Sequence, residues 1–173
     1  GDWWPGDFEG FVSRTDQIAD NKALKRYGLA SVVVNSEIRV FVTGFDGPNA
    51  LMRWSNGKLV DDTPEALKDP NTNAIGAAAG DIDGDGAEEL YVLTTGGQYG
   101  GKKAKTDRLY DRKDGQWRDL FAESDVPNRY SGRSVACTYT PDGYGFFVAR
   151  YAGPMQLITM ENGSLVDKAP AYG

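Results

Sequence analysis

An acidic stretch near the middle of the chain has the residue types and spacing of a cation site. Residues 81–89 read Asp-Ile-Asp-Gly-Asp-Gly-Ala-Glu-Glu, with carboxylates at positions 1, 3, 5 and 9 and glycine at position 6. Calcium prefers such hard oxygen ligands, takes about six to eight of them and tolerates irregular geometry. We predict that water and five protein groups bind Ca²⁺ here: the side chains of Asp81, Asp83, Asp85 and Glu89 and the carbonyl oxygen of Ala87.

Two other interpretations of this stretch were weighed against the metal site. A helix-loop-helix calcium motif needs a glutamate at position 12, which is Val92 here, and flanking helices, which the surrounding pattern does not support. The second interpretation is a solvated acidic turn without metal. Like charges ~5 Å apart repel by about 3 kcal/mol per pair, and this repulsion favours a bound cation. The corresponding turns at 35–37 and 140–143 keep one acid each, so one loaded site is expected.

Composition excludes much other chemistry. The 173 residues include no histidine and one cysteine, Cys137, so Ser-His and Cys-His nucleophile pairs, internal disulfides and Cys-rich zinc sites are excluded. The net charge of -6 at pH 7 repels nucleic acid, and no apolar run approaches the ~18 residues that span a bilayer. We expect no enzyme activity. The enzyme alternative would use paired carboxylates such as Asp61 and Asp62, for which the sequence shows no substrate cleft.

Short β-branched and aromatic runs between glycines predict an all-β fold. Asn-Gly or Asp-Gly pairs at 56–57, 114–115, 142–143 and 162–163 are typical of tight hairpin turns. Strands are expected at 30–35, 38–43, 51–54, 89–94, 108–111, 116–120, 135–140, 146–150 and 156–160, and the small-residue run 77–80 fits an inner strand.

An internal repeat organises these strands. Residues 40–61 align without a gap with residues 146–167, with ten identities in 22 positions. A middle copy aligns in two parts, which leaves an eight-residue insertion in the Gly/Lys loop 96–107. The chain therefore holds three four-stranded antiparallel units, at 28–73, 74–130 and 131–173, of the size of β-propeller blades. An N-terminal segment, 1–27, precedes them, and its apolar spacing after Asp16 permits a short helix.

Three blades do not close a ring, because propellers have about four to eight. An open array also leaves an unpaired edge. We expect the missing blades to come from the rest of the same chain, from a second copy or from a different subunit.

Residues 80–92, GDIDGDGAEELYV, resemble the calcium loop of FG-GAP/VCBS repeats in integrin-like β-propellers. With RLYDRKDGQWRDL at 108–120, the middle unit is most similar to the cartilage acidic protein and ASPIC/UnbV group. The resemblance implies a seven-bladed propeller outside the cytoplasm, with calcium tying the first two strands of each blade and no catalysis by the propeller. The sequence departs from that pattern in its number of blades, in the turns of its outer units, and in Glu89, where aspartate is usual.

These observations predict a non-catalytic, calcium-stabilised propeller that binds a protein partner or serves as a structural subunit. The larger assembly is expected to be extracytoplasmic: secreted, on the cell surface or in an organelle lumen. Two alternatives remain open, an adhesion module that binds glycan or matrix, and a carbohydrate-active enzyme or its accessory domain.

Overall fold

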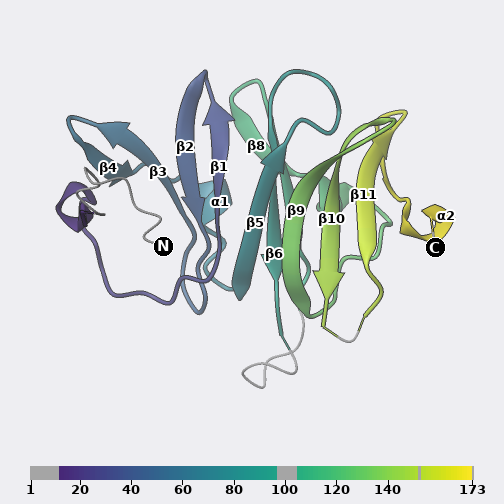
Figure 1. Ribbon diagram of the computed structural model, residues 1–173, viewed down its shortest axis with the longest axis horizontal. Coiled ribbons are helices and arrows are strands. Elements are labelled where there is room, and N and C mark those ends of the chain that lie inside the picture. The colour runs from purple at the N-terminus through teal and green to yellow at the C-terminus, as the bar shows by residue number, and fades with distance from the viewer. Residues whose placement is uncertain (1–11, 97–104, 152, 173) are drawn as a thin grey trace, which may run out of the picture.

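The computed structural model describes residues 12–96, 105–151 and 153–172, with side chains described up to residue 170. Most of the insertion predicted at 96–107 and the first eleven residues lie outside these ranges. The fold is all-β, as predicted, and consists of three four-stranded antiparallel sheets side by side (Figure 1). We call them the first, second and third blades.

Each blade is a meander whose strands follow one another in sequence order. The first blade comprises β1 (Leu29–Val34), β2 (Glu37–Val42), β3 (Ala50–Ser55) and β4 (Lys58–Asp61). The second comprises β5 (Ala74–Gly80), β6 (Glu89–Thr94), β7 (Arg108–Lys113) and β8 (Gln116–Asp119). The third comprises β9 (Gly132–Thr140), β10 (Gly143–Arg150), β11 (Gln156–Glu161) and β12 (Ser164–Asp167).

Little helix is present in the described residues. The chain forms short 3-10 turns η1 (Thr15–Gln17) and η2 (Leu120–Glu123) and single-turn helices α1 (Glu65–Lys68) and α2 (Ala169–Tyr172). None of the helices in the described ranges has the length and apolar character needed to cross a bilayer.

The turn between the third and fourth strands has the same backbone in every blade. Asn56-Gly57, Asp114-Gly115 and Asn162-Gly163 have positive φ at both residues, between +48° and +79°. That conformation is the two-residue hairpin turn that Asx-Gly pairs favour. At the remaining predicted pair, Asp142-Gly143, only Gly143 has positive φ, at +118°.

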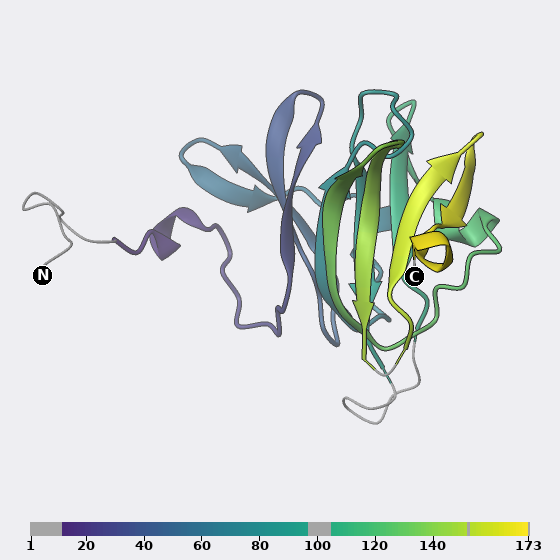
Figure 2. The ribbon, with the colours of Figure 1, turned by 45° about the vertical axis from the view of Figure 1, so that its right-hand side comes forward.

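The first strands of the blades, β1, β5 and β9, lie next to one another, with β5 in contact with both neighbours. Figure 2 shows the sheets fanning outward from these inner strands. Small residues permit the close approach, because a side chain at Gly80 in β5 would collide with the sulfur of Cys137 in β9. Cys137 is half-buried against the core, where it packs as a small hydrophobe.

Two apolar layers hold the blades together. Alternate residues of β6 point to opposite faces, so Leu90 and Val92 pack against the first blade while Tyr91 and Leu93 pack against the third. Every residue of β6 is buried for this reason. The continuous apolar run of β6 therefore identifies the sheet that is covered on both faces.

Of the short helix that the sequence permits in this segment, residues 12–28 form only the 3-10 turn η1, and residues 18–28 are not helical. Ile18 instead makes a parallel bridge to Leu59, and the Ala19 N–H donates to the Leu59 carbonyl at 2.8 Å. Further along, Leu24 and Tyr27 are exposed. A short helix is marginal without a buried apolar face, and bonding to the sheet edge replaces it here.

Candidate metal centre

The predicted cation-binding loop joins the first two strands of the second blade. β5 ends at Gly80 and β6 begins at Glu89, and these residues are register partners, so residues 81–88 form the connection. Gly84 and Gly86 have φ of +77° and +90°, a conformation that side chains disfavour. Glycine at these positions lets the loop fold back over the strand ends.

The loop carboxylates accept hydrogen bonds from nearby backbone N–H groups. This pattern curls the loop and fixes the aspartates in place. The bonds are Gly84 N to Asp81 Oδ1 (2.8 Å), Gly86 N to Asp81 Oδ2 (3.1 Å), Asp85 N to Asp83 Oδ1 (3.1 Å) and Ala87 N to Asp85 Oδ1 (2.8 Å).

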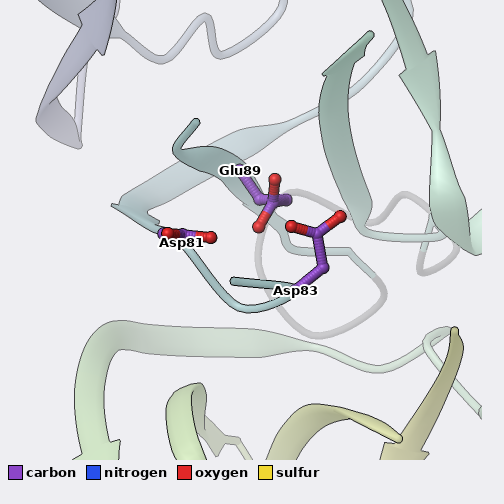
Figure 3. A group of neighbouring side chains, drawn as sticks. All are labelled: Asp81, Asp83 and Glu89. Carbon is purple, nitrogen blue, oxygen red and sulfur yellow. The ribbon is translucent and has the colours of Figure 1, made fainter. Parts of the chain in front are cut away.

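Three of the predicted ligands come together. Asp81, Asp83 and Glu89 each offer a carboxylate oxygen, and these oxygens all lie within 4.8 Å of one another. Figure 3 shows the three side chains converging, with Glu89 reaching in from the start of β6. Calcium binds oxygen at about 2.3–2.6 Å, so ligands on opposite sides of one ion are about 5 Å apart. The group therefore has the size that one Ca²⁺ requires.

The surroundings of the Glu89 carboxylate indicate most clearly whether a cation fits this site. Its side chain is 0% exposed, and only Oε2 is bonded, to the Ile82 N–H at 2.7 Å. Oε1 is buried without a hydrogen-bond partner. Burial above all, and the charges of Asp83, Asp111 and Asp81, raise the pKa of Glu89 to about 8. A metal ion would satisfy a buried carboxylate oxygen that has no protein donor and lies among other acids.

Asp83 is affected in the same direction. Its pKa is raised, first by burial and then by the charges of Asp85, Asp111 and Asp81, against the hydrogen bond from the Asp85 N–H. A divalent cation at this point would remove the electrostatic part of both shifts.

The structure does not bring all five predicted groups together. The Asp85 side chain is exposed, lies outside the group of three and accepts from the Ala87 N–H instead. Ala87 thus takes part through its N–H, and its carbonyl oxygen as a ligand stays a prediction, as does Asp85.

One acid near the site was missed by sequence reasoning. Asp111 in β7 is 2% exposed, and its charge acts on both Glu89 and Asp83. Arg118 donates to its Oδ2 at 2.8 Å, while Oδ1 is buried without a partner. The available signal was an acid inside a strand, directly after the apolar pair Leu109-Tyr110.

The corresponding turns of the other blades are shorter and differently bonded. Asn35 and Ser36 both have positive φ and form a tight turn. Asp142 is paired with Lys168 at 2.6 Å. Among the residues described, the second blade holds the one group of three or more acids with metal-site spacing.

The carboxylates of the enzyme alternative are engaged in structural contacts. Asp61 accepts from the N–H and hydroxyl of Thr63. Asp62 is paired with Arg39 at 2.8 Å and with Arg53 at 3.3 Å. Both acids border an open depression of ≈ 830 Å³ between the first and second blades.

Comparison with known proteins agrees with the repeat and the loop. The FG-GAP-like repeat family matches residues 39–92. Cartilage acidic protein 1 of Xenopus tropicalis is 37% identical over 178 residues, which cover 87% of this chain and 28% of that protein. The Mus musculus protein of the same name is 34% identical over 163 residues, covering 82% of this chain and 25% of its own length. The chain thus spans about a quarter of the relatives it matches.

A solved structure is also similar. It is a fucose lectin from Kordia zhangzhouensis in complex with methyl-fucoside, with 15% sequence identity and a TM-score of 0.47, covering 82% of this chain and 98% of the lectin. The sequence matches and the three four-stranded sheets support the resemblance to FG-GAP-like repeat proteins. Residues 39–92 match the FG-GAP-like repeat, and most of the chain is similar to part of cartilage acidic protein 1.

Proposed function

We propose that this chain is a non-catalytic segment of a β-propeller that is stabilised by one calcium ion in its second blade. The observations that carry the proposal are the convergence of carboxylate oxygens of Asp81, Asp83 and Glu89 and the buried, unpartnered Oε1 of Glu89. These residues would hold the ion, and water would complete its shell. The bound ion would supply a fixed positive charge between β5, the loop and β6, with no reaction attached to it.

The loop also connects the cation to blade packing. Glu88, next to Glu89, accepts a hydrogen bond from the Val33 N–H of β1 at 2.6 Å. Fixing the loop with calcium would therefore hold Glu88 against the inner strand of the first blade. This contact supports a role for the ion in the stability of the blade array.

The proposed partners are further blades or another protein that covers the two open ends of the array. The third blade presents Phe147 at 42% exposure beside an apolar groove of ≈ 470 Å³. The first blade exposes Leu29, Val33 and Ile38 on β1 and β2. Exposed apolar side chains at both ends of the array support an interface there.

An extracytoplasmic location, secreted, cell-surface or lumenal, belongs to the same proposal. Calcium sites of modest affinity, with dissociation constants of about 10⁻⁴–10⁻³ M, are typical of extracellular modules. Three acids in a partly exposed loop fit that range of affinity.

Titration calorimetry with Ca²⁺ tests the proposal. The wild-type chain should bind calcium, and Glu89→Gln should lose measurable binding because it removes the buried charge. Glu88→Gln is the matched control: it makes the same chemical change one residue away, keeps an acceptor oxygen for Val33, and should bind as the wild type does. Absence of heat and of binding in the wild type would refute the calcium site.

A further inference from the structure

Glu89 of β6 and Asp111 of β7 lie just beyond the last register pair of these neighbouring strands. β6 and β7 pair with the register Tyr91↔Leu109 and Leu90↔Tyr110. Continuing this register by one residue would set Glu89 opposite Asp111. Side chains directly opposite share one face with Cβ atoms about 5 Å apart, and like charges in that position destabilise a sheet. Both residues are buried, at 0% and 2% exposure.

Each of these two acids keeps one oxygen without a protein partner. Glu89 Oε2 accepts from Ile82, and Asp111 Oδ2 accepts from Arg118, whereas Glu89 Oε1 and Asp111 Oδ1 are buried and unbonded. Leaving a buried acceptor unsatisfied is costly, and more so for a charged group. Two such oxygens on one face indicate a shared partner, which would be a cation or a water molecule.

Arg118 does not supply that donor. Its Nε and Nη2 both contact the same oxygen, Asp111 Oδ2, at 2.8 Å, and its side chain is 46% exposed. One half-exposed guanidinium leaves the combined charge of Asp111 and the loop acids uncompensated. Asp111 also lies outside the group of oxygens that are within 4.8 Å of one another, so it does not share the inner shell of ligands.

We infer that Asp111 is a fourth carboxylate of the cation site, a positioning residue whose Oδ1 accepts a hydrogen bond from a water in the cation's shell. The inference rests on the proposed calcium site and extends it to a third strand. Outer-shell partners of this kind orient the ligands and raise metal affinity. The ion then ties β7 to the hairpin of β5 and β6, and Arg118 opposes cation binding while it neutralises Asp111 in the cation-free protein.

Calcium titration of three variants tests the inference. Asp111→Asn should weaken binding by about 10-fold or more, the usual effect of removing an outer-shell carboxylate. The matched control is Asp114→Asn, which makes the same charge change at an exposed turn residue with φ of +52°, a conformation that asparagine tolerates. Asp114→Asn should titrate as the wild type does.

Arg118→Gln separates an electrostatic role from a merely structural one. If Asp111 acts on the cation, removing the competing guanidinium should tighten calcium binding several-fold. If Asp111 only anchors the strand through Arg118, both variants should weaken binding. A wild-type affinity in Asp111→Asn, or a weakened one in Arg118→Gln, would overturn the inference. Should Asp111→Asn fail to fold, as judged by circular dichroism, the direction of the Arg118→Gln effect decides alone.

Terbium luminescence lifetimes in H₂O and D₂O provide a second readout, because they count water molecules bound directly to the ion. Asp111→Asn should leave that count unchanged, and a gain of one water would show a direct ligand and contradict the outer-shell position. If the wild type binds no calcium, the proposed function fails. If the wild type binds and Asp111→Asn is unaffected, only this inference fails.

Discussion

Asp119 and Asp167 occupy the same position in the second and third blades and make the same hydrogen bonds. Each carboxylate accepts from the N–H near the start of the third strand and from the N–H two residues downstream of the aspartate. The bonds are Leu109 N (3.2 Å) and Phe121 N (3.1 Å) to Asp119 Oδ1, and Leu157 N (3.1 Å) and Ala169 N (3.0 Å) to Asp167 Oδ1. In the second and third blades this aspartate thus ties the start of the third strand to the segment that follows the fourth strand.

We predict that Asp119→Ala lowers the free energy of unfolding by about 2 kcal/mol, because two N–H groups lose their acceptor. Asp119→Asn should cost less than half as much, since its amide oxygen can still accept. Asp125→Ala, at an exposed position, is the control and should change stability by less than about 0.5 kcal/mol. Urea unfolding measures all three, and equal losses for Asp119→Ala and Asp125→Ala would contradict this role.

The sequence could predict that this aspartate recurs but not what it does. Asp61 and Asp167 align in the repeat, and the pair Asp61-Asp62 was also the enzyme alternative. An aspartate that accepts hydrogen bonds from backbone N–H groups cannot be told from an aspartate that acts on a substrate by its residue type alone. Only the hydrogen bonds to Thr63 and the pairing of Asp62 with Arg39 distinguish them.

Strands of adjacent blades are joined by a buried ion pair. Asp107, just before β7, accepts from the Thr94 N–H at 2.8 Å and pairs with Arg150 of β10 at 2.7 Å, with both side chains 0% exposed. In the first blade the equivalent residue is Asn49, which accepts from the Gly44 N–H at 2.8 Å. Asparagine thus accepts the equivalent backbone hydrogen bond and carries no charge that needs a partner.

We predict that Arg150→Met destabilises the chain by about 3–5 kcal/mol, because it leaves the Asp107 carboxylate buried and unpaired. Adding Asp107→Asn should recover most of the loss, since the amide oxygen still accepts from Thr94 as Asn49 does for Gly44. Urea unfolding of the single and double variants gives the coupling between them. Equal stability of the two variants would show that the charge of Asp107 is not what Arg150 compensates.

The position of the strands was readable from the sequence, while the metal ligands were readable only in part. Alternating apolar residues and Asx-Gly pairs located the hairpins, because side-chain period and turn backbone are local properties. Asp85 followed the motif spacing, yet its side chain turns outward to the Ala87 N–H. Asp111 lies on a strand more than twenty residues after Glu89 in the sequence. No local spacing of residues predicts that Asp111 lies near the loop.

The loops predict a single cation site per chain. The turns at Asn35-Ser36 and Asp142-Gly143 lack the acids and the length of the loop in the second blade. Titration calorimetry should therefore give one calcium ion per chain. A stoichiometry of two or three would mean that the shorter turns bind as well, and would contradict the assignment to the second blade alone.

Equivalent residues of the three blades differ sharply in exposure, and this defines the ends of the array. Phe41 and Tyr91 are 0% exposed because the following blade covers them, whereas Phe147, at the same repeat position, is 42% exposed. The apolar groove beside Phe147 includes Leu157, the counterpart of Leu51 and of Leu109, which are both fully buried. The third blade thus presents the surface that another blade covers elsewhere in the chain.

We predict that the isolated chain associates as its concentration rises, because both end blades expose apolar faces. Phe147→Glu should reduce that association by placing a charge on the third blade's open face. Ala122→Glu adds the same charge at an exposed position in η2 and is the control. Sedimentation velocity measures the mass distribution, and equal association of Phe147→Glu and wild type would argue against this face as an interface.

Calorimetric unfolding of the wild-type chain in calcium and in chelator tests the central claim most directly. At a calcium concentration 100 times the dissociation constant, binding to the folded state alone adds about 2.7 kcal/mol, which raises the melting temperature of a chain this size by about 5–10 °C. Glu89→Gln should show no such rise, and Glu88→Gln should show it in full. Wild-type melting curves that coincide in calcium and chelator would contradict the account.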